Sequence, residues 1–241
     1  KGKQVISAFY NWCQELSKLG KSLHLLSNAS SFSKKKLHSK HQNMGYPFTL
    51  EQISCPRDLL ESALNEFKEL TRWGVLIPEG RDLPPLLHKE TIFLAQKEAF
   101  FQADAFLLIS AGTWTPKYQL TLIRALKERP RPVLVLNPDV AAPKESYFSA
   151  EWGYYLKEIQ DINPQTLLLG KPYPKLFESI LKKYKTLPSR TLMIGDTLHT
   201  DILGAQKLDI KTLFVETAES SKIKDKFSQT NIYPDFRFLL K

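Results

Sequence analysis

Two aspartates late in the chain have the residue type and spacing needed to bind a metal ion together with a phosphate group. Asp196 directly follows a short apolar segment that closes in Gly195, and Asp201 opens a segment whose apolar residues recur at helical spacing. This pattern predicts a buried strand, a tight turn and a helix, and open parallel sheets bind ligands beyond the carboxyl ends of their strands. Two carboxylates there suit a hard divalent cation. The alternative is that Asp196 only ends a strand and Asp201 only caps the helix.

Two other predicted strand ends carry groups that could bind a phosphoryl group. Ser27 and Asn28 close a short apolar segment and offer a hydroxyl, an amide and backbone N–H groups to an anion. The alternative is ordinary turn chemistry, in which serine and asparagine are common. Lys171 follows another apolar segment and stands between a glycine and a proline, so we expect a fixed cation at the same edge of the sheet. The alternative for Lys171 is a solvated surface lysine.

A further strand end reads Asn137-Pro138-Asp139. Asn137 and Asp139 are candidates for contact with a substrate. The residues also make a favourable turn, because asparagine and aspartate bond to their own backbone and proline fixes the chain direction. From these residues alone we favour the turn.

The elements that position these residues alternate between strands and helices. We expect helices at residues 5–19, 56–70, 91–101, 118–130, 145–159 and 173–184. We expect strands at residues 23–26, 73–80, 103–110, 132–136, 166–170, 191–195, 210–216 and 233–240, and a polar loop at 217–231. The middle of the chain repeats the alternation of the two ends, which implies a second α/β unit inserted into the first. The aromatic residues Trp152, Tyr154 and Tyr155 are expected to fill a seam between the two.

The predicted fold is therefore α/β, with a doubly wound parallel sheet as its core. Residues 1–72 and 165–241 form this core, and an α/β cap at residues 73–164 closes over the carboxyl ends of its strands.

Composition limits the class of protein. No apolar run approaches the roughly 20 residues needed to cross a bilayer, and no secretory signal is evident, so we expect a cytoplasmic protein that does not contact membranes. Cys13 and Cys55 lie in no metal-spacing motif and fit a reducing compartment. The net charge of +9 is spread over the chain. We therefore expect no nucleic-acid partner, and a basic surface would equally steer small anions to a cleft.

Taken in order, these motifs resemble those of a known family. The set consists of Ser27-Asn28, a long insertion with Asn137-Pro138-Asp139, then Gly170-Lys171-Pro172, Gly195-Asp196 and Thr200-Asp201. It resembles the haloacid dehalogenase (HAD) superfamily, in its NagD-like and p-nitrophenyl-phosphatase-like branch. The resemblance covers nearly the whole chain and implies a Rossmann-like core with an inserted α/β cap.

The resemblance implies a Mg²⁺-dependent phosphatase that hydrolyses a small phosphorylated metabolite through an aspartyl-phosphate intermediate. In that scheme Ser27 holds a phosphoryl oxygen, Lys171 neutralises charge, and Asp196 is catalytic and binds Mg²⁺. Asp201 supports the metal or anchors its loop. The substrate-binding set becomes Ser27, Asn28, Asn137, Asp139 and Lys171. A homo-oligomer formed through the cap is compatible with this scheme.

The sequence departs from the family pattern in three respects. The family's usual Thr-Asn-Asn is Ser27-Asn28-Ala29 here, which keeps the hydroxyl. The family's nucleophilic aspartate ends the first core strand, and no aspartate precedes Asp58 here, so we expect the nucleophile just upstream of Lys1. The alternative is a catalytically inactive phosphate-binding or interaction protein that lacks it. In addition, the family's glycine-rich segment after the Asn-Pro-Asp motif is replaced by bulkier residues at 146–155, which leaves the substrate open.

Overall fold

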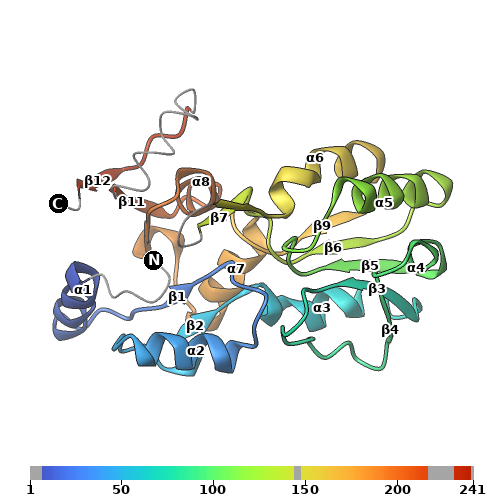
Figure 1. Ribbon diagram of the computed structural model, residues 1–241. Helices are drawn as coiled ribbons and strands as arrows, with labels where there is room; N and C mark the ends of the chain where they lie inside the picture. Colours follow the sequence, from blue (N-terminus) through green and yellow to red (C-terminus); the bar gives the residue numbers. More distant parts are fainter. Residues whose placement is uncertain (1–6, 144–147, 217–230, 240–241) are drawn as a thin grey trace. The chain divides into compact units, whose positions relative to one another are not determined.

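The computed structural model describes residues 7–143, 148–216 and 231–239. It divides into two compact units, Lys1–Gly170 and Lys171–Lys241, each of mixed α/β type with a parallel sheet (Figure 1). No helix in the described ranges is long and apolar enough to span a bilayer.

The first unit begins with two helices and a pair of short strands. Its elements up to the large sheet are α1 (Ser7–Lys18), β1 (Leu25–Leu26), α2 (Lys34–Asn43), η1 (Leu50–Gln52), β2 (Ile53–Ser54), η2 (Pro56–Leu59) and α3 (Leu60–Asn65). β1 and β2 pair in parallel. A buried cluster containing Cys13, Leu37 and Ile53 joins α1 and α2 to this pair, and both cysteines of the chain are free and buried.

The rest of the first unit forms a five-stranded parallel sheet. Its elements are β3 (Arg72–Leu76), β4 (Glu90–Phe93), α4 (Lys97–Gln102), β5 (Ala105–Leu108), α5 (Pro116–Glu128), β6 (Val133–Val135), α6 (Trp152–Ile162) and β9 (Thr166–Leu168), with a small antiparallel hairpin of β7 (Ala141–Pro143) and β8 (Phe148–Ala150) before α6. The strand order is β4-β3-β5-β6-β9, and every neighbouring pair is parallel. All five carboxyl ends therefore lie along one edge of the sheet.

Alternate residues of these strands pack against different helices. Val75, Leu107 and Leu134 lie in register across the sheet and pack with α3 on one face. Helices α4, α5 and α6 follow one another on the other face, α4 beside α5 and α5 beside α6 (Figure 1). On this face the ring of Phe106 lies against that of Phe100. Both faces are covered, as the continuous apolar strands predict.

The second unit is a three-stranded parallel sheet with short helices. Its elements are α7 (Pro174–Tyr184), η3 (Pro188–Arg190), β10 (Leu192–Gly195), the π-helical turn η4 (Leu198–Ile202), α8 (Leu203–Gln206), β11 (Lys211–Glu216) and β12 (Phe236–Leu239). The strand order is β10-β11-β12.

The α/β fold class is confirmed, but several element predictions are wrong. Residues 91–101 do not form one helix, because Glu90–Phe93 joins the sheet as edge strand β4 and the helix begins only at Lys97. The helix predicted at 145–159 begins at Trp152, after β8, and residues 144–147 lie outside the described part of the chain, as does most of the loop predicted at 217–231.

Two further observations bear on the predicted domains. The strand predicted at 166–170, grouped with the core by sequence, pairs as β9 with β6 of the five-stranded sheet. The rings of Trp152 and Trp114 lie 4.8 Å apart and Trp152 also contacts Tyr155, so these aromatics pack beside the helices of this sheet. The division into residues 1–72, 73–164 and 165–241 itself stays a prediction.

Candidate functional site

The loop after β1 carries Ser27 and Asn28 in the place that the sequence predicts. The Ser27 N–H donates to the carbonyl of Ser54, which extends the pairing of β1 with β2 by one residue. The Ser27 Oγ then accepts a hydrogen bond from the N–H of Ala29 at 3.1 Å. Ser27 is half-buried and Asn28 is buried. The hydroxyl of Ser27 is thus held in a defined turn at a strand end.

Asn28 and Asp139 are 111 residues apart in sequence and in direct contact in the structure. The Nδ2 of Asn28 donates to Oδ1 of Asp139 at 2.7 Å. The N–H of Asp139 donates in turn to Oδ1 of Asn137 at 3.2 Å, so the Asn-Pro-Asp motif is the self-bonded turn that its sequence favours. This turn follows β6 at the carboxyl edge of the five-stranded sheet. The structure therefore brings together three of the five predicted substrate-binding residues.

Two glycines permit this close approach. A Cβ at Gly170 would lie 2.5 Å from Cδ of Pro138 and 2.8 Å from Oδ1 of Asn28. A Cβ at Gly153 would lie 2.4 Å from the carbonyl oxygen of Pro138. Gly153 was not singled out from the sequence, although an isolated glycine between large aromatics in a helical pattern indicates tight packing.

The second unit contains most of the charged residues predicted for the site. Nζ of Lys171 lies 2.6 Å from Oδ1 of Asp201, and the two side chains are only 10% and 7% exposed. The other oxygen of Asp201, Oδ2, accepts the N–H of Thr197 at 3.2 Å. Asp201 thus fixes both the lysine ammonium and the loop that follows β10.

Asp201 is not the N-cap of a helix. The helical turn η4 begins at Leu198, and Asp201 lies inside it with its N–H donating to the carbonyl of Thr197. Because its carboxylate binds Thr197 from within the turn, the interpretation of Asp201 as a simple cap is wrong. Gly195 accommodates this arrangement, since a Cβ there would lie 2.3 Å from Cβ of Asp201 and 2.5 Å from its Oδ2.

Asp196 directly follows β10, at the strand end predicted for it. Its side chain is half-buried, and Oδ1 accepts a hydrogen bond from Oγ1 of Thr197 at 3.4 Å. Within the described residues no group of three or more histidine, cysteine, aspartate or glutamate side chains could hold a metal ion. Asp201 already binds the ammonium of Lys171.

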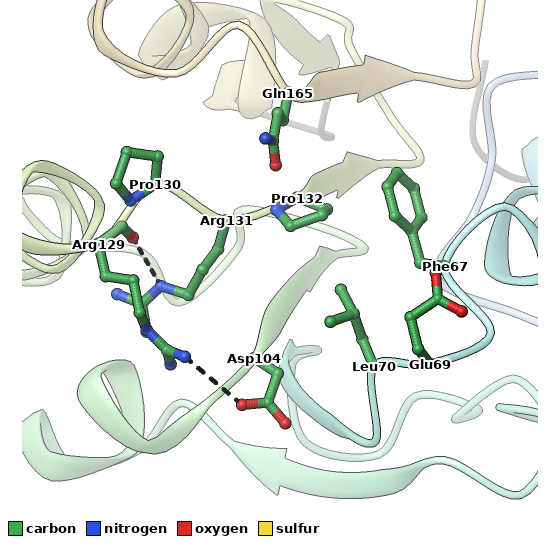
Figure 2. A pocket seen from close by; sticks show the side chains of 9 residues that line it. All are labelled: Phe67, Glu69, Leu70, Asp104, Arg129, Pro130, Arg131, Pro132 and Gln165. Atoms are coloured by element: carbon green, nitrogen blue, oxygen red, sulfur yellow. Dashed lines mark hydrogen bonds and ion pairs between the residues drawn. The ribbon is translucent and has the colours of Figure 1, made fainter.

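A groove elsewhere in the first unit is not part of this site. Its volume is about 440 Å³, and Figure 2 shows the residues that line it: Phe67, Glu69, Leu70, Asp104, Arg129, Pro130, Arg131, Pro132 and Gln165. The groove lies at the amino ends of β5, β6 and β9, opposite the edge where parallel sheets bind ligands. Arg131 is buried, which lowers its pKa to about 10, and it donates to the carbonyls of Phe100 and Ala103. The arginines that line the groove bind backbone carbonyls at the ends of helices and strands. We therefore assign these residues a role in packing and not in ligand binding.

Comparisons with known proteins agree with the motifs. Residues 168–238 match a protein-family profile described as HAD-hydrolase-like. Chronophin from Bos taurus is 44% identical over 57 residues, which cover 24% of this chain and 19% of chronophin. The chain thus spans about a fifth of the length of this relative.

Solved structures match over nearly the whole chain. A possible sugar phosphatase of the HAD superfamily from Cytophaga hutchinsonii has a TM-score of 0.75 at 19% identity, over 95% of this chain and 85% of its own. NagD from E. coli has a TM-score of 0.69 at 16% identity, over 98% of this chain and 90% of its own. Residues 168–238 are thus similar in sequence to HAD-hydrolase-like proteins, and the chain is similar in fold to these two solved structures. Its fold is that of the NagD-like branch, with a Rossmann-like core and a cap.

Proposed function

We propose that this chain supplies the phosphate-binding and charge-neutralising groups of a Mg²⁺-dependent phosphatase that acts on a small phosphorylated metabolite. The observation that carries the proposal is the buried ion pair of Lys171 with Asp201, next to Asp196 at the end of β10. A buried ion pair is poor evidence of stability, because desolvation offsets the attraction between the charges. A cation that is held at a strand end despite this desolvation cost is well placed to bind an anionic ligand.

The roles of the charged residues follow from their contacts. Lys171 neutralises charge on the phosphoryl group, and its bond to Asp201 holds the ammonium in one place before the substrate arrives. Such preorganisation matters because catalysis of phosphoryl transfer is mostly positioning and electrostatic stabilisation. Asp201 is a positioning residue in this scheme, since both of its oxygens are engaged by Lys171 and Thr197.

The residues present fit a Mg²⁺ ion with few protein ligands. Mg²⁺ is commonly bound by one or two carboxylates together with phosphate oxygens and water, so a site need not contain three acidic side chains. Asp196 would hold it, and Asp201 would support that site through the loop it fixes. When bound, the metal would neutralise phosphate charge and orient the phosphoryl group.

Polar groups of the first unit would contact the substrate. Ser27 would donate its hydroxyl to a phosphoryl oxygen, beside the backbone N–H groups of its loop. Asn28 is held by Asp139, and Asp139 by Asn137, so we propose that this trio shapes the substrate side of the site. Residues 73–164 would act as the cap of the core formed by residues 1–72 and 165–241. The sequence of the cap would then select the substrate.

The nucleophilic aspartate is expected upstream of Lys1. Among the described residues, β1 and β10 each pair with a neighbour on one edge alone, so either could receive a further parallel strand. An upstream parallel strand that ends in aspartate would place its carboxylate at the carboxyl edge of the sheet it joins, as Ser27 and Asp196 each follow the carboxyl end of a strand in their own sheet.

Hydrolysis of p-nitrophenyl phosphate by the full-length protein tests this proposal. We expect turnover in Mg²⁺ that EDTA abolishes, and binding of inorganic phosphate in the same buffer. Phosphate binding without turnover would favour the inactive phosphate-binding protein. If the protein neither binds phosphate nor hydrolyses the ester, the proposal is wrong.

A further inference from the structure

The loop of residues 27–33 is held from outside by two side chains to which the phosphatase scheme gives no role. Asp82 comes from the proline-rich connection between β3 and β4, and Arg57 from the short helix η2. We call these two residues the loop clamp. All of its contacts lie within the first unit.

Asp82 binds the end of the loop at the start of α2. Its Oδ2 accepts the N–H of Ser33 at 2.8 Å, and its Oδ1 lies 2.5 Å from Nζ of Lys36. Its own N–H donates to the carbonyl of Ser31 at 3.3 Å. One residue thus contacts the loop through its side chain and its backbone.

Arg57 binds the middle of the same loop and connects it to Asp82. Its Nε donates to the carbonyl of Ser30 at 2.6 Å, and its Nη2 donates to the carbonyl of Asp82. Ser30 is also tied to the sheet, because its Oγ donates to the carbonyl of Ile109 at 2.7 Å. The segment that leaves Asn28 is therefore fixed at successive residues.

The charge at the start of α2 explains why a carboxylate is needed here. The first turn of α2 contains Lys34, Lys35 and Lys36 and no acidic residue. Cations are unfavourable at a helix N-terminus, whose N–H groups carry partial positive charge. Asp82 supplies the missing negative charge from another part of the chain, and Asp58 lies 3.4 Å from Lys34. Without Asp82, repulsion would loosen the turn next to the phosphate loop.

We propose that Asp82 is a positioning residue that holds the Ser27–Asn28 loop in its phosphate-binding conformation. This inference rests on the proposed function, because it assumes that Ser27 and its loop bind phosphate. The clamp fixes the loop before a ligand arrives, which lowers the ordering cost of binding. Its loss should therefore weaken phosphate binding more than it slows the chemical step.

The variants are Asp82→Ala and Asp82→Asn in the full-length protein, with Asp104→Ala as the matched control. Asp104 also accepts a backbone N–H, from Arg72 at 3.1 Å, and pairs with a cation, the Arg72 guanidinium, at 3.0 Å. Their side chains are similarly exposed, 23% for Asp82 and 17% for Asp104. Asp104, however, precedes β5 at the amino edge of the sheet, away from the loop.

We expect Asp82→Ala to raise the Kd for inorganic phosphate and the KM for p-nitrophenyl phosphate about tenfold, with a smaller change in kcat, as the loss of a charge-assisted hydrogen bond implies. Hydrogen exchange of the amides at residues 27–33 should become faster. Asp82→Asn should have a smaller effect, because its amide oxygen still accepts the Ser33 N–H. Asp104→Ala should change neither the Kd nor exchange in this loop.

The outcomes separate the two proposals. If the wild-type protein binds phosphate and Asp82→Ala changes neither the Kd nor hydrogen exchange in the loop, the positioning role of Asp82 is wrong. The proposed function would then still stand. Equal effects in Asp82→Ala and Asp104→Ala would overturn it too, since they would reflect general destabilisation. A wild-type protein that neither binds phosphate nor hydrolyses the ester would overturn the proposed function and the role of Asp82 with it.

Discussion

The two units of this protein hold their candidate site residues by different physical means. In the first unit, the amide of Asn28 donates to the carboxylate of Asp139, and the backbone N–H of Asp139 donates to the amide oxygen of Asn137. In the second unit, Lys171 and Asp201 form a buried pair of full charges. A neutral amide can be replaced with modest loss, whereas a buried charge that loses its partner is strongly destabilising. The same substitution should therefore have unequal effects in the two units.

The largest effect on stability is expected for Asp201→Asn. The change leaves the Lys171 ammonium buried without its carboxylate, which should cost about 3 kcal/mol of unfolding free energy. Denaturant unfolding measures this cost, and phosphatase activity should fall in the same variant because Lys171 is no longer held. A loss of unfolding free energy smaller than that measured for Asp139→Asn would contradict the proposed difference between the two units.

Asp139→Asn is the matched change in the first unit, with an expected cost of about 1 kcal/mol. The new amide keeps an oxygen that can accept from Nδ2 of Asn28, so the contact survives without its charge. The same denaturant titration gives the value. A cost as large as that of Asp201→Asn would show that the carboxylate of Asp139 has a charged role that the hydrogen bonds do not explain.

Acid pH should lower the stability of the two units to a similar and small extent. The hydrogen bond from Lys36 lowers the pKa of Asp82 to about 2, and that from Lys211 lowers the pKa of Asp235 to about 2, against an ordinary 3.8. Because the folded-state pKa is the lower one, this stabilisation is present above about pH 4 and is lost as the pH falls towards 2. Thermal melts should show Asp82→Asn and Asp235→Asn lowering Tm at pH 7 and converging with the wild type near pH 2. A constant difference at both pH values would contradict the assigned pKa shifts.

The sequence predicts those parts of the fold that depend on local pattern. Ser27, Asn137, Lys171 and Asp196 were all expected to follow apolar strands, and each does, because buried strands in parallel sheets are continuous apolar runs with polar ends. The alternation of strands with helices also gave the correct fold class.

What the sequence could not predict depends on contacts between distant segments. Glu90–Phe93 is too short a pattern to be distinguished from a helix until it pairs with β3. The bond between Asn28 and Asp139 and the clamp residue Asp82 both depend on how loops meet at the edge of a sheet. No local signal marks Asp82, which lies in what reads as a simple proline-rich connection.

The central claim is that Asp196 binds a metal ion needed for phosphate hydrolysis, and Asp196→Asn tests it most directly. The change removes one negative charge from a hard-cation site and nearly preserves its shape. The control is Asp209→Asn, an exposed aspartate of the same unit at a position with φ of 55°, which asparagine also tolerates. Full-length variants would be assayed for p-nitrophenyl phosphate hydrolysis across a Mg²⁺ titration, with thermal melts in EDTA. We predict that Asp196→Asn loses activity and Mg²⁺ affinity by orders of magnitude while its melting temperature in EDTA is unchanged or raised, and that Asp209→Asn matches the wild type. Unchanged activity and unchanged Mg²⁺ dependence in Asp196→Asn would contradict the site assignment, together with the roles proposed for Ser27 and Lys171.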